Sequence, residues 1–175
     1  LKVFRAPGEV RFLELSTEIA HNLGQYMCRA GHQVGDPAIM KEGWICERVN
    51  FSDWEGRDNV GGNLFGSCWP EASLALTTLE VPGLYVQTDT GVVQAIDHID
   101  ASILEQKEDG LLLALENPTA FDAEVSVLAE TSERARTVAL GTMEAFSLPR
   151  VFVPAGENVQ VFCSLRGELR EELGA

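Results

Sequence analysis

The stretch GLLLALENPTAFDAEVSVLAE, Gly110–Glu130, shows how the second half of this chain is built. Two runs rich in apolar residues flank Asn117-Pro118, and a proline cannot donate a backbone hydrogen bond to a central strand ladder. In the second run Val125 and Val127 alternate with polar side chains, and this period of two gives a strand one buried and one solvated face. The stretch therefore predicts two strands joined by an exposed turn at Asn117-Pro118.

Runs of the same kind recur on both sides of this stretch, and turn-forming residues separate them. The predicted strands are Ser73–Thr78, Leu84–Thr88, Val92–Ile99, Ser102–Lys107, Leu111–Glu116, Ala123–Glu130, Ala135–Leu140, Glu144–Leu148 and Val159–Ser164, with further turns at Pro82-Gly83, Asp109-Gly110 and Pro154-Ala155-Gly156. No helical run separates these strands, which argues against parallel βαβ units and favours an antiparallel sandwich. Its expected core side chains are Leu113, Val125, Val127, Val159 and Val161. We interpret Gly167–Ala175 as a charged tail with a helical turn.

Residues 8–30 are predicted to form one long helix, which Pro7-Gly8 precede and Gly31 caps. Apolar side chains recur in it at three- and four-residue spacings. The side chains expected to pack inward are Leu13, Leu23 and Met27, and those that widen the apolar stripe are Phe12, Leu15 and Tyr26. Because the stripe is wider than one sheet needs, we expect it to meet a second copy of the chain or the remainder of a longer chain.

Together these patterns predict a mainly β chain with two parts. Residues 73–175 form an antiparallel, Ig-like β-sandwich, and residues 1–72 form a helical lead-in with an irregular segment rich in Trp and Gly. The irregular segment, residues 31–72, keeps neither strand nor helix periodicity for long. Long irregular segments in compact proteins are more often functional than filler, so we look for a site there.

The part of this segment from Gly43 to Glu71 mixes aromatic, acidic, basic and glycine residues. The predicted ligand-binding residues are Trp44, Asp53, Trp54, Glu55 and Trp69. The two acids flank Trp54, so in an extended backbone both carboxylates point to one face, with Cα atoms roughly 7 Å apart. Paired carboxylates perform acid–base chemistry on glycosidic bonds, and tryptophan faces suit the apolar faces of sugars. The same residues also fit a structural interpretation, in which the tryptophans anchor the segment on a core and the acids pair with nearby arginines.

The charge of the chain excludes some partners. The formal net charge is −14, and residues 73–175 carry most of it, with 17 acidic against 6 basic residues. Nucleic acids and anionic membrane surfaces need clustered lysine and arginine, so we exclude both as partners of this part. No apolar run is long enough to span a membrane. No dinucleotide or P-loop motif occurs and the histidines are not spaced as metal ligands, so we expect no cofactor and no metal.

The four cysteines are Cys28, Cys46, Cys68 and Cys163. None belongs to a C-x-x-C pair, which argues against a zinc site or a thioredoxin-like site. Two interpretations stay open: four buried thiols, or one or two disulfides in an exported protein.

Two parts of the sequence resemble carbohydrate-active enzymes. Glu116-Asn117-Pro118-Thr119, Asp122 to Val127 and Val153-Pro154-Ala155-Gly156 resemble a strand pair and a turn of the C-terminal β-sandwich modules of large enzymes with (α/α)-toroid catalytic domains. The predicted helix and GWICERVNFSDWEG (Gly43–Gly56) are similar to the closing helix and loop of such a toroid. The resemblance implies a sandwich module that supports or binds carbohydrate. It carries over no catalytic residue, because the matched residues cover only a small part of a toroid.

Three functions stay open at this point. The first is a non-catalytic β-sandwich module associated with carbohydrate binding or with a carbohydrate-active enzyme. The second is a self-contained, glycosidase-like enzyme that uses the carboxylates of residues 43–71, and the third is an interaction or assembly module. The helix stripe favours the first and third because it needs a partner, and the Trp and carboxylate cluster favours the second.

Overall fold

In the computed structural model, the described residues are 2–5, 8–25, 27–33, 41–44, 46–48, 64–66, 80–138 and 147–172. The chain packs as two compact units, one made of Leu1–Ala20 with Leu79–Ala175 and the other of His21–Thr78. We call them the sheet unit and the middle unit. The boundary predicted between residues 72 and 73 lies outside the described residues.

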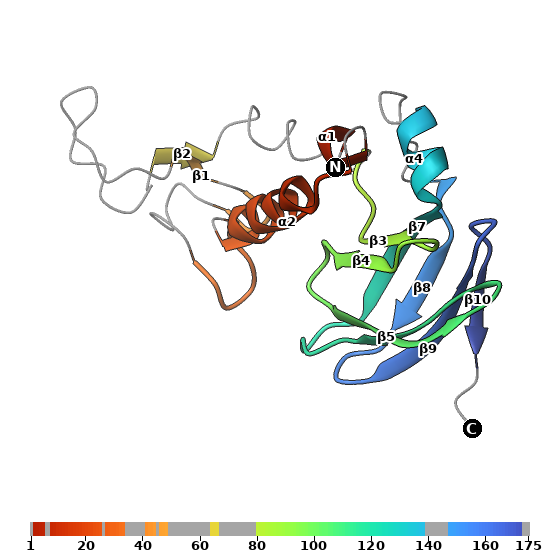
Figure 1. The fold of residues 1–175 in the computed structure, drawn as a ribbon. Helices are drawn as coiled ribbons and strands as arrows, with labels where there is room; N and C mark the ends of the chain where they lie inside the picture. The colour runs from red at the N-terminus through yellow and green to blue at the C-terminus, as the bar shows by residue number, and fades with distance from the viewer. Residues whose placement is uncertain are drawn as a thin grey trace. The chain divides into compact units, whose positions relative to one another are not determined.

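Two four-stranded sheets make up most of the sheet unit (Figure 1). Sheet I has the strand order β10-β9-β6-β5, and sheet II has the order β4-β3-β7-β8. The strands are β3 (Leu84–Gln87), β4 (Val92–Ala95), β5 (Asp100–Lys107), β6 (Gly110–Glu116), β7 (Ala123–Glu130), β8 (Arg150–Val153), β9 (Asn158–Ser164) and β10 (Leu169–Glu172). The described pairings are antiparallel except that of β3 with β7, which is parallel. The mainly β prediction is therefore confirmed, and the expectation of antiparallel pairing is wrong for β3 and β7.

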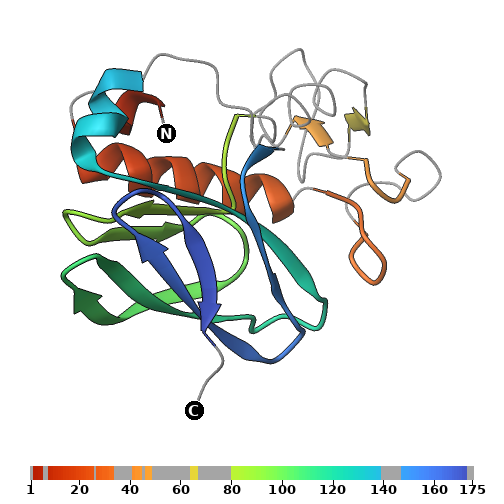
Figure 2. The same cartoon turned by 90° about the vertical axis from the view of Figure 1, so that its right-hand side faces the viewer.

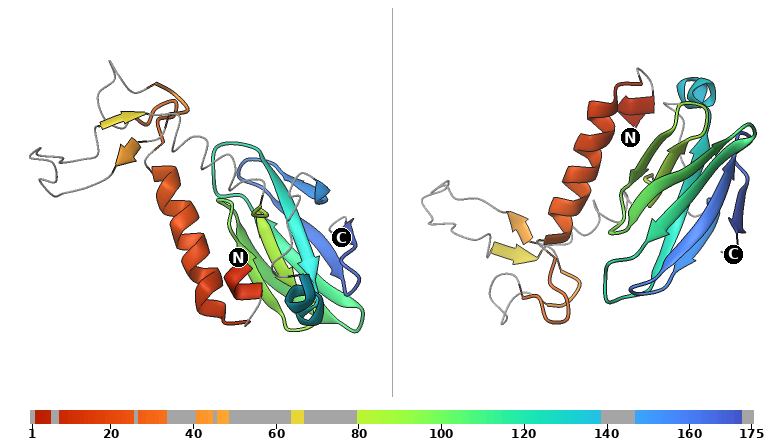
Figure 3. Two further views of the ribbon diagram at one scale, coloured as in Figure 1. Left: turned by 90° about the horizontal axis from the view of Figure 1, so that it is seen from above. Right: turned by 60° about the horizontal axis from the view of Figure 1, so that its bottom comes forward.

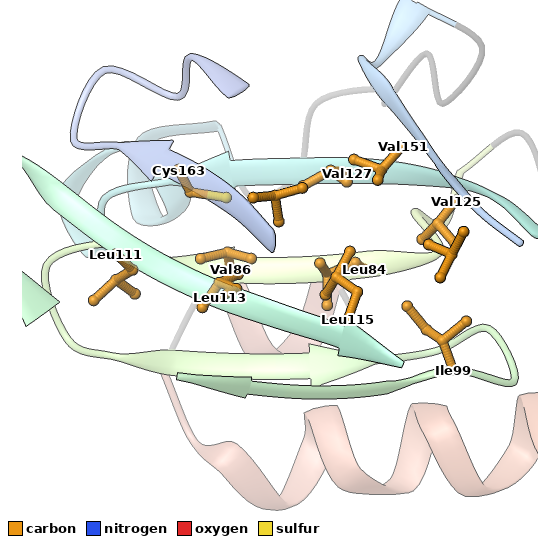
Figure 4. Packing of buried hydrophobic residues seen from close by; sticks show 12 residues of the cluster. Leu84, Val86, Ile99, Leu111, Leu113, Leu115, Val125, Val127, Val151 and Cys163 are labelled. Atoms are coloured by element: carbon orange, nitrogen blue, oxygen red, sulfur yellow. The ribbon is translucent and has the colours of Figure 1, made fainter. Parts of the chain in front are cut away.

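Aliphatic side chains from both sheets fill the space between them and form one hydrophobic cluster (Figure 4). Leu111 and Leu115 of sheet I are completely buried in it, as are Leu84 and Val86 of sheet II. Of the five side chains predicted for the core, four are buried and Val159 is half-buried against the same cluster. Burying one such side chain contributes about 1.5–3 kcal/mol, so this shared cluster holds the sandwich-like pair of sheets together.

Helices cover the other face of sheet II within the sheet unit (Figures 2 and 3). Tyr85 of β3 points away from the main cluster and packs with Phe4 of α1 (Lys2–Arg5) and Leu13 of α2 (Val10–Gln25). The rings of Phe4 and Tyr85 meet edge to face, with centroids 5.3 Å apart. Leu13 thus packs inward as predicted. None of the helices among the described residues is long and apolar enough to cross a membrane.

The helix predicted over residues 8–30 is shorter in the structure, because α2 ends at Gln25. Beyond it, Cys28 uses its backbone in other pairings. Its N–H donates to the Trp44 carbonyl and its carbonyl accepts from the Gly43 N–H, both at 2.8 Å. These bonds replace the intrahelical bonds that a continued helix would need.

Short turns and strands make up the rest of the middle unit that the structure describes. Arg29 and His32 pair around a turn in which Gly31 has a φ of +77°, so Gly31 closes this turn and the prediction that it caps the helix is wrong. Farther along, β1 (Cys46–Arg48) pairs with β2 (Leu64–Gly66) in an antiparallel ladder.

The predicted strand Ala135–Leu140 is wrong, because a helix, α4 (Ser132–Val138), occupies most of it. The hydroxyl of Thr131 accepts a backbone N–H of the first turn, which is a standard N-cap. Asp89, in the β3–β4 turn, accepts hydrogen bonds from the N–H and the hydroxyl of Ser132 at 2.8 and 2.6 Å. Burial would raise the pKa of Asp89, but the Ser132 hydrogen bonds hold this pKa below its usual value. A carboxylate 43 residues away in the sequence thus helps to fix the helix start.

The last strand and the two turns also refine the predictions. The helical turn expected in Gly167–Ala175 is wrong, because β10 pairs there with β9. Strand β8 was not predicted, and the predicted strand Ser73–Thr78 lies outside the described residues. The first three residues of the predicted strand Glu144–Leu148 also lie outside them, and the strand is wrong for Ser147 and Leu148, which are not in a strand. Pro154-Ala155-Gly156 does form a turn, with Gly156 at a φ of +72°. At the other turn Pro118 is exposed, but Asn117 is completely buried, so the expected exposure is wrong for Asn117.

The two cysteines whose side chains the structure describes, Cys28 and Cys163, are buried thiols. Burial raises the pKa of Cys163 to about 12, so its thiolate is scarce at neutral pH. Cys68 and the side chain of Cys46 are outside the described residues, and their state stays a prediction.

A buried carboxylate connects α1 to sheet II. Glu130, at the end of β7, is 1% exposed and accepts two hydrogen bonds from Arg5, both at 2.8 Å. The hydroxyl of Tyr85 donates to the same carboxylate at 3.1 Å and accepts from the side-chain amide of Gln87 at 3.0 Å. Burial and then the Glu130 charge raise the pKa of Tyr85 well above its usual value, which keeps the phenol protonated as a donor. The carboxylate is thus fully paired and holds α1 against the sheet.

Replacing Arg5 with methionine should lower the free energy of unfolding by about 3–5 kcal/mol, because it leaves the Glu130 carboxylate buried without its cation. The double variant Arg5→Met/Glu130→Met should be markedly more stable than Arg5→Met alone. The matched control is Arg150→Met, which removes an exposed ion pair with Glu124 and should cost at most about 1 kcal/mol. Urea unfolding followed by circular dichroism measures all three, and equal losses for Arg5→Met and Arg150→Met would contradict this account.

Candidate functional site

Of the five ligand-binding residues predicted from the sequence, the structure describes Trp44. It lies in the middle unit, its side chain is 40% exposed, and its backbone pairs with that of Cys28. Asp53, the Trp54–Glu55 pair and Trp69 are outside the described residues. The predicted site of residues 43–71 therefore stays a prediction.

A groove of about 440 Å³ lies on the outer face of sheet I, the face turned away from the shared core. We call it the outer groove. Its lining residues are Asp100, Ala101, Ser102, Leu104, Ala114, Glu116, Asn158 and Gln160, from β5, β6 and β9. These three strands are neighbours in the sheet, so the groove has a floor of hydrogen-bonded backbone.

Strand alternation places the polar residues of the groove. Because Leu113 and Leu115 of β6 point into the core, Ala114 and Glu116 must point outward. The same alternation on β9 turns Asn158 and Gln160 outward beside a core-facing Val161. The core therefore determines which side chains form the groove.

The strand register arranges these side chains in two rows across the sheet. Glu116 is directly opposite Asp100 on one side and Asn158 on the other. In the next row, Ala114 separates Ser102 from Gln160. In each row, β5 and β9, the two strands that flank β6, thus carry a side chain that can form hydrogen bonds.

An irregularity in β5 completes the groove. The pairing with β6 shifts between Ile103 and Glu105, which leaves Leu104 as an extra residue in the ladder. Its side chain is 50% exposed and lines the groove. The bulge therefore adds an apolar wall to a polar surface.

The five polar side chains of the groove have no partner among the described residues. None of Asp100, Ser102, Glu116, Asn158 or Gln160 makes a side-chain hydrogen bond or ion pair there. Some surface acids elsewhere are paired with arginines, as in the Arg150–Glu124 and Arg170–Glu168 pairs at 2.7 and 3.1 Å. The carboxylates and amides of the groove are thus available to a ligand.

Two further hollows among the described residues offer less to a ligand. One, of about 350 Å³, lies at the opposite end of the same face of sheet I, around Phe162. There Arg170 is already paired with Glu168, and the ammonium group of Lys107 lies 5.6 Å from the centre of the Phe162 ring. The other, of about 510 Å³, is a shallow depression along α2.

The outer groove suits a hydroxyl-rich, uncharged ligand. Carboxylates accept hydrogen bonds, side-chain amides both donate and accept, and a serine hydroxyl does both. The described residues contain no group of three or more His, Cys, Asp or Glu that could hold a metal ion. In the sequence, the polar residues of the groove are side chains that alternate with apolar ones along each strand. The sequence does not reveal that Asp100, Glu116 and Asn158 lie in one row, because that depends on the strand register.

Comparisons of the chain with protein-family models, with curated proteins and with solved structures find no match.

Replacing Asp100 with asparagine should raise the free energy of unfolding by roughly 0.2–1 kcal/mol, because like charges directly opposite each other destabilise a strand pair. The gain should shrink as salt is added, since salt screens exposed charges. Glu124→Gln is the matched control, because Glu124 is paired with Arg150 and its neutralisation removes an attraction. Urea midpoints at low and high ionic strength test this, and a less stable Asp100→Asn chain would show that the carboxylate has a stabilising role.

Proposed function

We propose that this chain is a non-catalytic β-sandwich module that binds carbohydrate in the outer groove of sheet I. The observation that carries the proposal is two adjacent rows of unpaired carboxylate, amide and hydroxyl side chains on the outer face of a hydrogen-bonded sheet. These groups match the alternating donors and acceptors of sugar hydroxyls. Fixed positions on strands also lower the entropy that binding costs.

Charge favours a neutral sugar over a phosphorylated or sulfated one. The groove contains Asp100 and Glu116 and no basic residue, and the whole chain has a net charge of −14. An anionic ligand would be repelled at long range and would meet two carboxylates on contact. We therefore expect neutral oligosaccharides to bind.

The resemblance to sandwich modules of carbohydrate-active enzymes supports the same proposal, including an Ig-like topology for the two sheets. Of its matching residues, Glu116 lines the outer groove, while Asp122 to Val127 run into β7 and Val153 to Gly156 lie at the end of β8. The enzymatic alternative uses the carboxylates of residues 43–71, Asp53 and Glu55 among them. That alternative rests on residues that the structure does not describe.

The double variant Asn158→Ala/Gln160→Ala should abolish binding of neutral oligosaccharides, because it removes the amide donors and acceptors from β9. Isothermal titration calorimetry against gluco-, manno- and xylo-oligosaccharides of two to six units measures this. The matched control is Gln106→Ala, an exposed amide on β5 that does not line the groove, and it should bind as wild type does. Wild-type protein that binds no sugar of the panel would refute the proposal, as would binding by the double variant at wild-type strength.

A second candidate function, assembly through α2, is favoured by its exposed apolar side chains. Leu15 and Ile19 are 50% and 52% exposed, and with half-buried Phe12 they follow one edge of the helix. Glu14 and Glu18 flank this edge. These exposed side chains support assembly, and we propose that a second copy or the remainder of a longer chain covers them.

If a second copy covers α2, the chain should self-associate more strongly as salt is added, because salt screens the repulsion between the Glu14 and Glu18 side chains of the two copies. Multi-angle light scattering at increasing protein and salt concentrations measures the mass. Leu15→Ser/Ile19→Ser should be monomeric, and the exposed control Asn22→Ser should behave as wild type. A wild-type chain that stays monomeric throughout would eliminate the second copy as the partner.

A further inference from the structure

The loop between β6 and β7, residues 117–122, presents Phe121 to solvent. This side chain is 73% exposed, the highest value among the large hydrophobic residues that the structure describes. Exposing a phenylalanine forgoes the stabilisation that its burial would contribute. The loop thus offers an apolar ring that a ligand can contact.

The loop is held by a completely buried asparagine, Asn117. Its side-chain amide donates to the carbonyls of Phe121 and Val153, at 2.8 and 3.0 Å. Its side-chain oxygen accepts from the N–H and the hydroxyl of Thr119, at 3.0 and 2.7 Å. Two donors and two acceptor positions are thus all in use, which is the full capacity of an asparagine side chain.

These bonds fix the backbone on which the aromatic ring is mounted. The carbonyl of Phe121 is bound by Asn117, and its N–H donates to the Thr119 hydroxyl at 3.3 Å. The loop also has a contact with the neighbouring turn, because Asp122 accepts from the Ala155 N–H at 3.0 Å. A ring on such a backbone has only two side-chain torsions to lose on binding, so ordering it costs little entropy.

The same asparagine connects the loop to the outer groove. The backbone N–H of Asn117 donates to the Glu157 carbonyl, and the backbone carbonyl of Asn117 accepts from the Gly156 N–H, both at 2.9 Å. Glu116 and Asn158, two residues of the groove, directly adjoin Asn117 and Glu157 in the sequence. The covalent distances and the 2.8 Å hydrogen bond place the Cα atoms of Glu116 and Phe121 at most about 13 Å apart.

We infer that Phe121 is a stacking platform for a sugar ring beyond the end of the outer groove, so that the ligand is an oligosaccharide or polysaccharide chain and not a single sugar. This inference rests on the proposed carbohydrate binding. The groove supplies hydrogen bonds to the sugar hydroxyls, and the exposed ring supplies an apolar face for the C–H face of a further unit. The hydrogen bonds of Asn117 connect the loop with the residues next to the groove. A sugar chain that spans both therefore meets the Phe121 backbone and the groove at a fixed spacing.

The test compares Phe121→Ala with wild type across the ladder of neutral oligosaccharides of two to six units, by calorimetry. The variant should bind the shortest sugars as wild type does and should bind the longest ones about tenfold more weakly. The matched control is Phe152→Ala, which removes another exposed phenylalanine, 54% exposed and on β8, and should leave all affinities unchanged. Because Phe121 is at the surface, its removal should leave the circular dichroism spectrum and the urea midpoint unchanged.

The outcomes separate this inference from the proposed function. If Phe121→Ala binds every chain length as wild type does, while Asn158→Ala/Gln160→Ala does not bind, the platform is refuted and the groove stands. Equal weakening of Phe121→Ala for short and long sugars would also refute the platform, because it would place the ring inside the groove's own subsite. If wild type binds none of the sugars, both the groove and the platform are refuted.

Discussion

The packing of aliphatic side chains between sheets I and II is the constraint on which the rest of the sheet unit depends. Each core-facing leucine of β6 fixes the orientation of both its neighbours, because successive side chains of a strand point to opposite faces. Once Leu113 and Leu115 are buried, Ala114 and Glu116 are committed to the outer face. A one-residue shift in register would exchange the two sets and destroy core and groove together. The candidate binding surface is thus specified by the hydrophobic core beneath it.

Two buried polar residues add what the aliphatic core cannot supply, which is a defined position for segments outside the sheets. Glu130 holds α1 through Arg5, and Asn117 holds the 117–122 loop through four side-chain hydrogen bonds. An unpaired polar group in either place would cost more than its bonds return, so each arrangement is strongly preferred over its alternatives. The Arg5–Glu130 contact stabilises the packing of α1 on sheet II. The Asn117 side chain fixes the backbone of the loop that carries the exposed Phe121.

The sequence predicts the fold well where the signal is local. The alternation in 123–130 and 159–164 predicted β7 and β9 almost to the residue, together with the core side chains Val125, Val127 and Val161. Where distant contacts decide, local patterns mislead. Residues 135–138 look like a strand, yet Thr131 and the Asp89 contact from the β3–β4 turn begin a helix there. The parallel β3–β7 pair depends on strands about forty residues apart, and no local pattern reveals it.

In the candidate site, too, local patterns predict some features and distant contacts decide the others. Glu116, Asn158 and Gln160 were visible in the sequence as the polar half of two strands, but their convergence with Asp100 depends on pairing across β5, β6 and β9. The composition of the Trp-rich segment, in contrast, predicts a site from one local stretch of sequence. Asn117 was predicted to be an exposed turn residue, because Asn-Pro signals a turn and does not reveal that the amide side chain turns inward.

Mapping of backbone and side-chain amide chemical shifts by NMR, during titration with neutral hexasaccharides, tests the central claim most directly. The account predicts perturbations concentrated on the outer face of β5, β6 and β9, including the side-chain amides of Asn158 and Gln160. Perturbations confined to Trp44 and the 43–71 segment, or an unchanged spectrum at saturating sugar, would contradict it.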